Sequence, residues 1–156
     1  MKQGFVKVAS ATPRIRVADP VYNAQVICEQ AKEAAEHGAK IVVFPELCIT
    51  GYTCNDLFLQ ELLLEKAKEA LLTIAEETGQ LETLFLVGLP VDKDGRLYNV
   101  AAVLYRGRIL GMIPKKNIPM YAEFYEGRHF TPGEETVTEY RLGKQVIPFG
   151  SNLLFR

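Results

Sequence analysis

The sequence has little of three features that would define a function class: an excess of charge of one sign, metal-binding side chains, and long apolar runs. Its 156 residues carry 18 Lys and Arg against 19 Asp and Glu, which gives a net charge of −1 and a pI near 6.2. This balance gives no electrostatic case for nucleic acid or an anionic membrane as a partner. The apolar runs are far shorter than the ~20 residues of a membrane-spanning helix, and no signal-peptide core is present at the N-terminus. We therefore expect a cytoplasmic protein.

Cysteine and histidine are also scarce. The three cysteines, Cys28, Cys48 and Cys54, cannot all pair within one chain, and none forms a C-x-x-C motif with another. Reduced thiols are therefore the expected state. With only His37 and His129 to add, none of the usual zinc-ligand spacings occurs, so we predict no metal site.

The N-terminal third of the chain predicts a β-α-β unit. Phe5–Ser10 alternates in polarity like a strand, and Asp19 followed by proline is a typical helix start. Apolar residues then recur at helical spacing up to Gly38, which is suited to end the helix. Lys40–Phe44 follows at once as an apolar, β-branched strand of the kind buried in a sheet.

The rest of the chain departs from simple β-α alternation. A second helix is predicted over about Gln60–Thr78. The following residue runs have strand character: Leu84–Gly88, Asn99–Tyr105, Arg108–Ile113, Tyr140–Leu142 and Gln145–Ile147. Hairpins among βα units predict an α/β fold with two mixed sheets packed face to face and helices outside. Asn152–Phe155 reads as the start of a further apolar strand that nothing covers, so we expect the fold to be incomplete at the C-terminus.

An acidic residue follows the strand that ends at Phe44. Pro45 cannot donate to a sheet ladder, so Glu46 is predicted to lie at the carboxyl edge of the sheet, where active sites of α/β folds collect. A carboxylate in that place is suited to proton transfer. The alternative is a solvated acid with no chemical role.

A second group of reactive side chains follows the strand that ends near Ile113. Lys115, partly desolvated at a strand end, would be able to stabilise a developing oxyanion. Glu123 and Glu126 lie within reach in the sequence. Four aromatic residues could wall a pocket: Tyr121, Phe124, Tyr125 and Phe130. The alternative is a solvated Lys115–Lys116 pair with the aromatic residues in the core.

The two segments together resemble the carbon–nitrogen hydrolase (nitrilase) superfamily. The matching runs are F-P-E-L-C-I-T-G-Y at Phe44–Tyr52 and P-K-K-N-I-P-M-Y-A-E-F-Y-E-G-R-H-F at Pro114–Phe130. Within the superfamily, T-G-Y-x-C-x-D-L-F at Thr50–Phe58 and Y-x-E-F-Y-E-x-R-x-F in the second run are similar to the glutaminase domains of glutamine-dependent NAD(+) synthetases. The resemblance covers Val6–Phe155. It implies an α-β-β-α sandwich, in agreement with the two sheets predicted from the hairpins.

The resemblance also implies roles for individual residues. Glu46 matches the family's general base and Lys115 the lysine that supports the oxyanion of the tetrahedral intermediate. Glu126 matches a further glutamate that many members have near that lysine.

The implied substrate is glutamine, whose side-chain amide is hydrolysed through a cysteine thioester. Tyr121 matches a tyrosine of the amide-substrate pocket, and Tyr52 and Phe124 are candidates for its wall. The ammonia would pass to a separate synthetase domain of the same full-length chain. No cofactor is implied for the glutaminase step, and ATP and Mg are implied only for the synthetase domain, which is absent here. The exposed edge and apolar surface of an incomplete domain predict a homo-oligomer.

The chain departs from the family pattern at the nucleophile. The family's cysteine follows the lysine segment, whereas no cysteine occurs here after Cys54. Cys48 and Cys54 match family positions that are not the nucleophile. Cys28 lies on the side of its predicted helix that faces the protein core. We therefore expect residues 1–156 to be the N-terminal part of a carbon–nitrogen hydrolase domain that is inactive alone. The alternatives are another nitrilase branch acting on a small amide, nitrile or carbamoyl compound, and a noncatalytic scaffold of the same fold.

Overall fold

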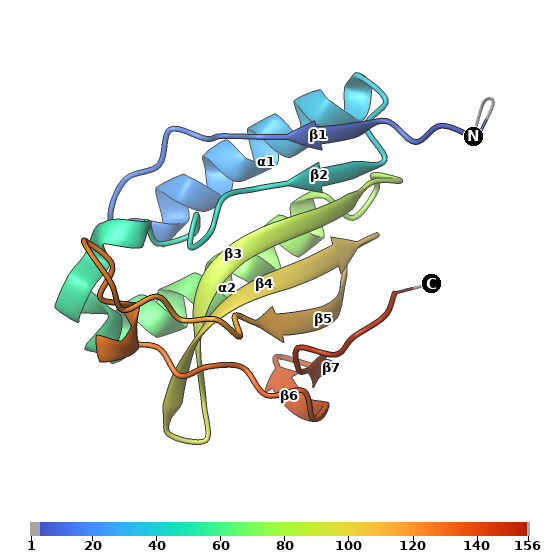
Figure 1. Cartoon of the computed structure of the whole chain (residues 1–156). Helices are drawn as coiled ribbons and strands as arrows, with labels where there is room; N and C mark the ends of the chain where they lie inside the picture. The colour runs from blue at the N-terminus through green and yellow to red at the C-terminus, as the bar shows by residue number, and fades with distance from the viewer. Residues whose placement is uncertain (1–3, 156) are drawn as a thin grey trace.

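A computed structural model describes residues 4–155 and shows them as one mixed seven-stranded sheet with the strand order β1-β2-β3-β4-β5-β7-β6 (Figure 1). The elements, in chain order, are β1 Val8–Ser10, α1 Pro20–Glu36, β2 Ile41–Val43, the 3₁₀ segment η1 Tyr52–Leu59, α2 Glu61–Glu77, β3 Leu84–Lys93, β4 Arg96–Tyr105, β5 Arg108–Pro114, the 3₁₀ turn η2 Glu126–Arg128, β6 Thr138–Leu142 and β7 Gln145–Phe149.

The predicted β-α-β unit is confirmed. Pro20 is the first residue of α1, and the carboxylate of Asp19 caps the helix by accepting a hydrogen bond from the backbone N–H of Tyr22 at 3.1 Å. The helix ends before Gly38, whose φ of +82° suits glycine. The flanking strands are shorter than predicted, but β1 and β2 pair in parallel, with Val8 opposite Ile41.

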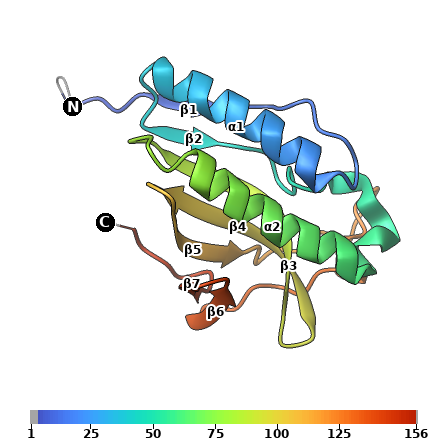
Figure 2. The same cartoon turned by 180° about the vertical axis from the view of Figure 1, so that it is seen from behind.

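Helices α1 and α2 lie on the same face of the sheet (Figure 2). Their buried sides share one core with alternate residues of the central strands. The largest fully buried side chains of that core include Ile27, Leu71, Ile74, Phe85, Val87, Leu89, Leu104, Met112 and Ile147. Burying a side chain of this kind contributes roughly 1.5–3 kcal/mol, so this face carries much of the stabilisation of the fold.

The prediction of two sheets is wrong for the described residues. β3, β4 and β5 form a continuous antiparallel meander, and β7 then joins the edge of β5 in parallel through the pair Met112 and Phe149. The hairpin of β6 and β7 therefore extends the same sheet. Hairpin signals fix only which neighbouring strands pair, whereas the β5–β7 contact joins segments far apart in the sequence.

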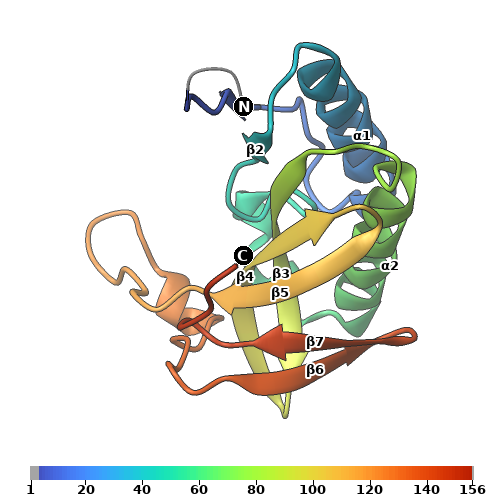
Figure 3. The same cartoon turned by 90° about the vertical axis from the view of Figure 1, so that its right-hand side faces the viewer.

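The other face of the sheet carries no helix from residues 4–155. Strand alternation directs Leu86 and Ala101 toward this open face, because their neighbours Phe85 and Ala102 lie in the helix-side core. Asn152–Phe155 forms no strand, contrary to the prediction, and instead passes over the side of the sheet away from the helices (Figure 3). The segment packs there because Gly111 has no side chain: a Cβ at Gly111 would lie 2.9 Å from the ring of Phe155.

No helix of the described chain is both long enough and apolar enough to cross a membrane.

Candidate active site

Glu46 lies in a tight turn that leaves β2 and crosses β3. The turn passes so close to Gly88 that a Cβ there would come within 2.4 Å of the backbone nitrogen of Leu47 and 2.7 Å of the carbonyl oxygen of Pro45. The carbonyl of Gly88 in turn accepts the backbone N–H of Ile49 at 3.1 Å. Leu47 is fully buried with a φ of +52°, a conformation uncommon outside glycine. This packing fixes the backbone that carries Glu46.

Lys115 follows β5 directly and is fixed through its backbone. Its N–H donates to the carbonyl of Asn99 on β4 at 2.7 Å, and its carbonyl accepts the N–H of Gly133 at 2.8 Å. The side chain is left free to extend from the end of the sheet toward Glu46.

The three predicted polar residues meet at Lys115. Its ammonium donates to Oε1 of Glu46 at 2.6 Å and to both oxygens of Glu126 at 3.0 and 2.9 Å. Glu46 and Lys115 are 69 residues apart in the sequence, so only the sheet brings them together. The structure thus places a carboxylate, an ammonium and a second carboxylate in one connected group.

Glu126 is the buried member of this group. Its side chain is 5% exposed, compared with 40% for Glu46 and 29% for Lys115. Tyr52 donates its hydroxyl to Oε1 of Glu126 at 2.7 Å. A buried carboxylate requires such partners, because an unpaired charge in the interior costs several kcal/mol.

The electrostatics of the group keep Lys115 charged. Burial lowers the pKa of its ammonium, but the hydrogen bonds and charges of Glu46 and Glu126 together outweigh this and leave the pKa raised. Burial and the hydrogen bond to Glu126 raise the pKa of Tyr52 well above its ordinary value. Lys115 is therefore a permanent cation near neutral pH, and Tyr52 is a hydrogen-bond donor.

Asn99 is a member of the group that sequence analysis missed. Its side-chain amide donates to Oε1 of Glu46, and the residue is 4% exposed. It lies on β4 at a position that alternation directs away from the helix-side core. A polar side chain in an otherwise apolar strand is the signal that could have identified it, because such a residue needs a buried partner.

The aromatic residues of the second segment are less closely placed. Tyr121 is 69% exposed and borders an open groove that also includes Lys115. Phe124 packs edge-on against Tyr121, with ring centroids 5.7 Å apart. The assignment of Tyr121, Phe124 and Tyr52 to a substrate pocket stays a prediction; what the structure shows for Tyr52 is its hydrogen bond to Glu126.

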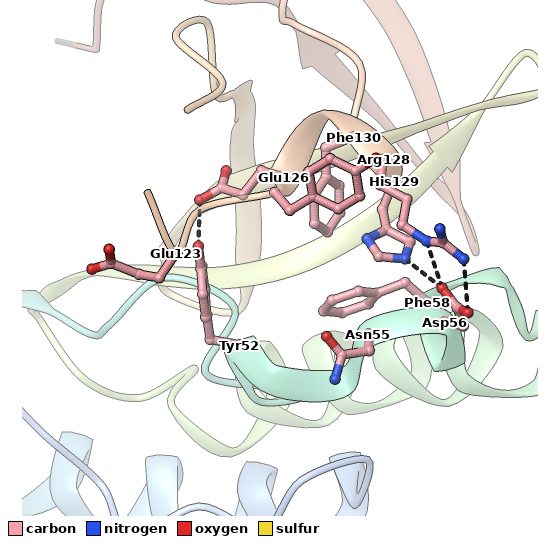
Figure 4. A pocket seen from close by; sticks show the side chains of 10 residues that line it. Tyr52, Asn55, Asp56, Phe58, Glu123, Glu126, Arg128, His129 and Phe130 are labelled. Atoms are coloured by element: carbon pink, nitrogen blue, oxygen red, sulfur yellow. Dashed lines mark hydrogen bonds and ion pairs between the residues drawn. The ribbon is translucent and has the colours of Figure 1, made fainter. Parts of the chain in front are cut away.

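Besides the groove at Tyr121, two cavities border the polar group. One, of about 540 Å³, lies on the open face of the sheet and is lined by Glu46, Asn99 and Lys115 together with apolar residues of β3, β4 and β5. The other, of about 420 Å³, lies between η1 and η2 and is lined by Tyr52 and Glu126 among others (Figure 4). The first cavity gives a reacting group access to Glu46 and Lys115.

None of the three cysteines has the environment of a nucleophile. Burial raises the pKa of both Cys28 and Cys48 to about 11, and it also raises the pKa of Cys54. The Cys48 thiol donates to the carbonyl of Gly88, and the Cys54 thiol to that of Thr50 at 3.1 Å. A reactive cysteine needs thiolate character and access, and these thiols lack both.

We expect the folded chain to resist thiol alkylation. With a pKa of about 11, roughly one Cys48 thiol in a thousand is ionised at pH 8, and the side chain is buried. Iodoacetamide at pH 8 should label Cys28, Cys48 and Cys54 slowly in the native protein and rapidly in denaturant, as measured by intact-mass spectrometry. Rapid stoichiometric labelling of Cys48 without unfolding would contradict this.

In residues 4–155, no three His, Cys, Asp or Glu side chains gather in a way that could hold a metal ion.

The sequence of this chain matches a known protein family. The chain belongs to the carbon–nitrogen hydrolase family, whose family model matches residues 7–151. It is 39% identical over 154 residues to glutamine-dependent NAD(+) synthetase from Mycobacterium tuberculosis, a match that covers 99% of this chain and 23% of that protein. The chain thus spans about a quarter of the length of the curated relatives it matches.

Solved structures agree with this assignment. A glutamine-dependent NAD(+) synthetase from Cytophaga hutchinsonii matches 93% of this chain and 25% of its own, with a TM-score of 0.87 and 29% identity. An amidase from Nesterenkonia matches 92% of this chain and 54% of its own, with a TM-score of 0.68. At 24% identity, the amidase shows likeness of fold alone.

Proposed function

We propose that this domain contributes the acid–base and oxyanion-binding half of a glutaminase site, which releases ammonia from glutamine for NAD(+) synthesis in a longer protein. The observation that carries the proposal is the hydrogen-bonded group of Glu46, Lys115 and Glu126 beside a cavity on the open face. The likeness to glutamine-dependent NAD(+) synthetases over nearly the whole chain supports the choice of substrate.

Glu46 acts as the base in both halves of the reaction. It first takes the proton of a cysteine thiol as the sulfur bonds to the amide carbon, and the electron pair of the carbonyl moves to oxygen. The intermediate then collapses, the C–N bond breaks, and the same proton leaves with the nitrogen as ammonia. Water next attacks the thioester with Glu46 again accepting a proton, the C–S bond breaks, and glutamate and the thiol are released.

Lys115 supplies positive charge where the oxyanion develops. Its ammonium already lies 2.6 Å from Glu46, so base and cation face the same space. Glu126 keeps the lysine in place from the buried side, and Tyr52 holds Glu126. A cation fixed in advance costs no reorganisation when charge develops on the substrate, which is how such sites lower the barrier.

The nucleophile and the second sheet are proposed to come from chain beyond residue 156. The buried thiols of residues 4–155 support this, as does the short span of the chain on its relatives. The open face, with the cavity next to Glu46, is where a second sheet would pack to complete an α-β-β-α sandwich. We also propose that ATP and Mg bind to a separate synthetase domain of the longer protein and that the glutaminase step needs no cofactor. For the 156-residue chain alone, where this face is uncovered, the same surface is the basis for proposing a homo-oligomer.

An assay of glutamate release tests the proposal. The 156-residue chain alone is expected to give no turnover with L-glutamine, whereas a polypeptide that continues through the complete domain should hydrolyse L-glutamine in preference to a small amide such as propionamide. With the synthetase domain present, glutamine should also support NAD(+) formation. Turnover by the 156-residue chain that Cys48→Ala or Cys54→Ala abolishes would contradict the assignment of the nucleophile. Preference for propionamide would favour a small-amide hydrolase.

A further inference from the structure

A second ionic cluster lies across the smaller cavity from Glu46, Lys115 and Glu126, which we call the catalytic group after their proposed roles. Arg128 donates from Nε and a terminal nitrogen to the two oxygens of Asp56, at 2.9 and 3.0 Å. The ring of His129 contacts the same carboxylate, with Nε2 3.0 Å from Oδ1 (Figure 4). One carboxylate from η1 thus joins two consecutive residues at the end of η2. We call Asp56, Arg128 and His129 the clamp.

Aromatic side chains pack beneath the clamp. Phe58 packs edge-on against Phe130 and against the ring of His129, with centroid distances of 5.0 and 5.8 Å. Phe58 and Phe130 belong to a small buried cluster that also contains Leu47, the residue after Glu46. The contacts that seat the clamp are therefore continuous with the turn that carries the proposed base.

The clamp and the catalytic group hold the same short turn at its two ends. The backbone N–H groups of His129 and Phe130 donate to the carbonyl of Glu126 at 3.0 and 2.9 Å. These bonds tie Glu126 directly to the residues that Asp56 holds. At the other end, η1 contacts Glu126 again through the hydroxyl of Tyr52.

Isolated surface ion pairs contribute little, with typical values of ~0–1 kcal/mol. The geometry of Asp56 is more specific than such a pair, because the arginine contact is bidentate and a second ring shares the carboxylate. Its expected effect is on position, since it fixes the distance between η1 and η2 and hence the place of Glu126.

We propose that Asp56 is a positioning residue for the catalytic group: by holding Arg128 and His129, it keeps Glu126 against Lys115. The functional consequence rests on the proposed glutaminase reaction, but the structural claim does not. In the intact enzyme, a misplaced Glu126 leaves Lys115 less well aimed at the oxyanion. Loss of the clamp should therefore lower kcat more than it raises KM.

The first test is an NMR titration of the Lys115 side chain in the 156-residue chain. In wild type, Glu46 and Glu126 raise the pKa of Lys115. In Asp56→Asn, which removes the charge and nearly keeps the shape, Glu126 should move away and the pKa of Lys115 should fall. Asp56→Glu should restore part of the wild-type value. Asp56 is 62% exposed, so the variants are expected to fold.

The matched control is Glu77→Gln, which removes an exposed carboxylate paired with Lys32 on the helical face. It should leave the Lys115 titration unchanged. A second variant, Arg128→Lys, keeps the charge but removes the two-pronged contact, and should act in the same direction as Asp56→Asn.

The outcomes distinguish the positioning role of Asp56 from the proposed glutaminase function. An unchanged Lys115 titration in folded Asp56→Asn and Arg128→Lys would overturn the clamp, whatever the enzyme does. A lowered Lys115 pKa without any glutaminase activity in the intact protein would support the clamp and count against the proposed function. A purely structural role would lower the unfolding midpoint without moving the Lys115 titration, and that result would also overturn the proposal.

Discussion

Replacement of Glu46 by glutamine in the intact enzyme is expected to lower glutaminase turnover by roughly 10²-fold or more, the scale of general acid–base catalysis. The side-chain oxygen can still accept hydrogen bonds from Lys115 and Asn99, because the substituted amide nearly keeps the shape of the glutamate. The amide cannot take the thiol proton, so kcat should fall while substrate binding changes little. Steady-state glutamate release measures both quantities.

A matched control for this variant is Glu135→Gln. Glu135 is an exposed glutamate that pairs with Lys116, one residue from Lys115. The control removes the same charge near the same strand end but contacts none of Glu46, Lys115 and Glu126, so turnover should stay close to wild type. The general-base assignment would be wrong if Glu46→Gln retained near-normal turnover.

Local order in this protein follows local sequence signals. Asp19 and Pro20 start α1, and Gly38 follows its end, because capping bonds and positive φ depend on neighbours a few residues away. The hairpin of β4 and β5 likewise follows from Arg106-Gly107, both with positive φ. These elements were predicted to within a few residues.

The sheet's order depends on contacts that no local pattern contains. The parallel contact between Met112 and Phe149 attaches the last hairpin to β5 and makes one sheet where two were predicted. Asn152–Phe155 has strand-like composition, but it crosses the sheet face at Gly111 without joining a ladder. A strand needs an available edge, and composition alone does not supply one.

The candidate site also combines features that the sequence predicted with long-range contacts that it did not. The motif resemblance predicted Glu46, Lys115 and Glu126, and the structure brings all three into contact. Asn99 was missed because its role depends on a cross-sheet hydrogen bond. Sequence could also not show that Tyr52 holds Glu126, because the two are 74 residues apart.

The position of Glu46 depends on the absence of a side chain at Gly88, where an added Cβ would come closer to backbone atoms than at any other glycine of residues 4–155. An alanine Cβ at this position would lie 2.4, 2.7 and 3.0 Å from backbone atoms of Leu47, Pro45 and Glu46. None of these is the end of a flexible side chain, so the whole turn must move. We expect Gly88→Ala to destabilise the fold by about 1–3 kcal/mol, the usual cost of overpacking, or more.

Urea unfolding of the 156-residue chain measures this cost, and the NMR titration of Lys115 shows whether Glu46 has moved. Displacement of the turn should weaken the contact between Glu46 and Lys115, so the pKa of Lys115 should fall as well. The comparison is Ala101→Val at the cross-strand partner of Gly88, which adds bulk to the same cavity at a residue that already has a Cβ, so it separates added volume from the backbone clash. If Gly88→Ala were as stable as wild type with an unchanged Lys115 titration, the turn would not depend on close contact with β3, and the rigid placement of Glu46 would need another cause.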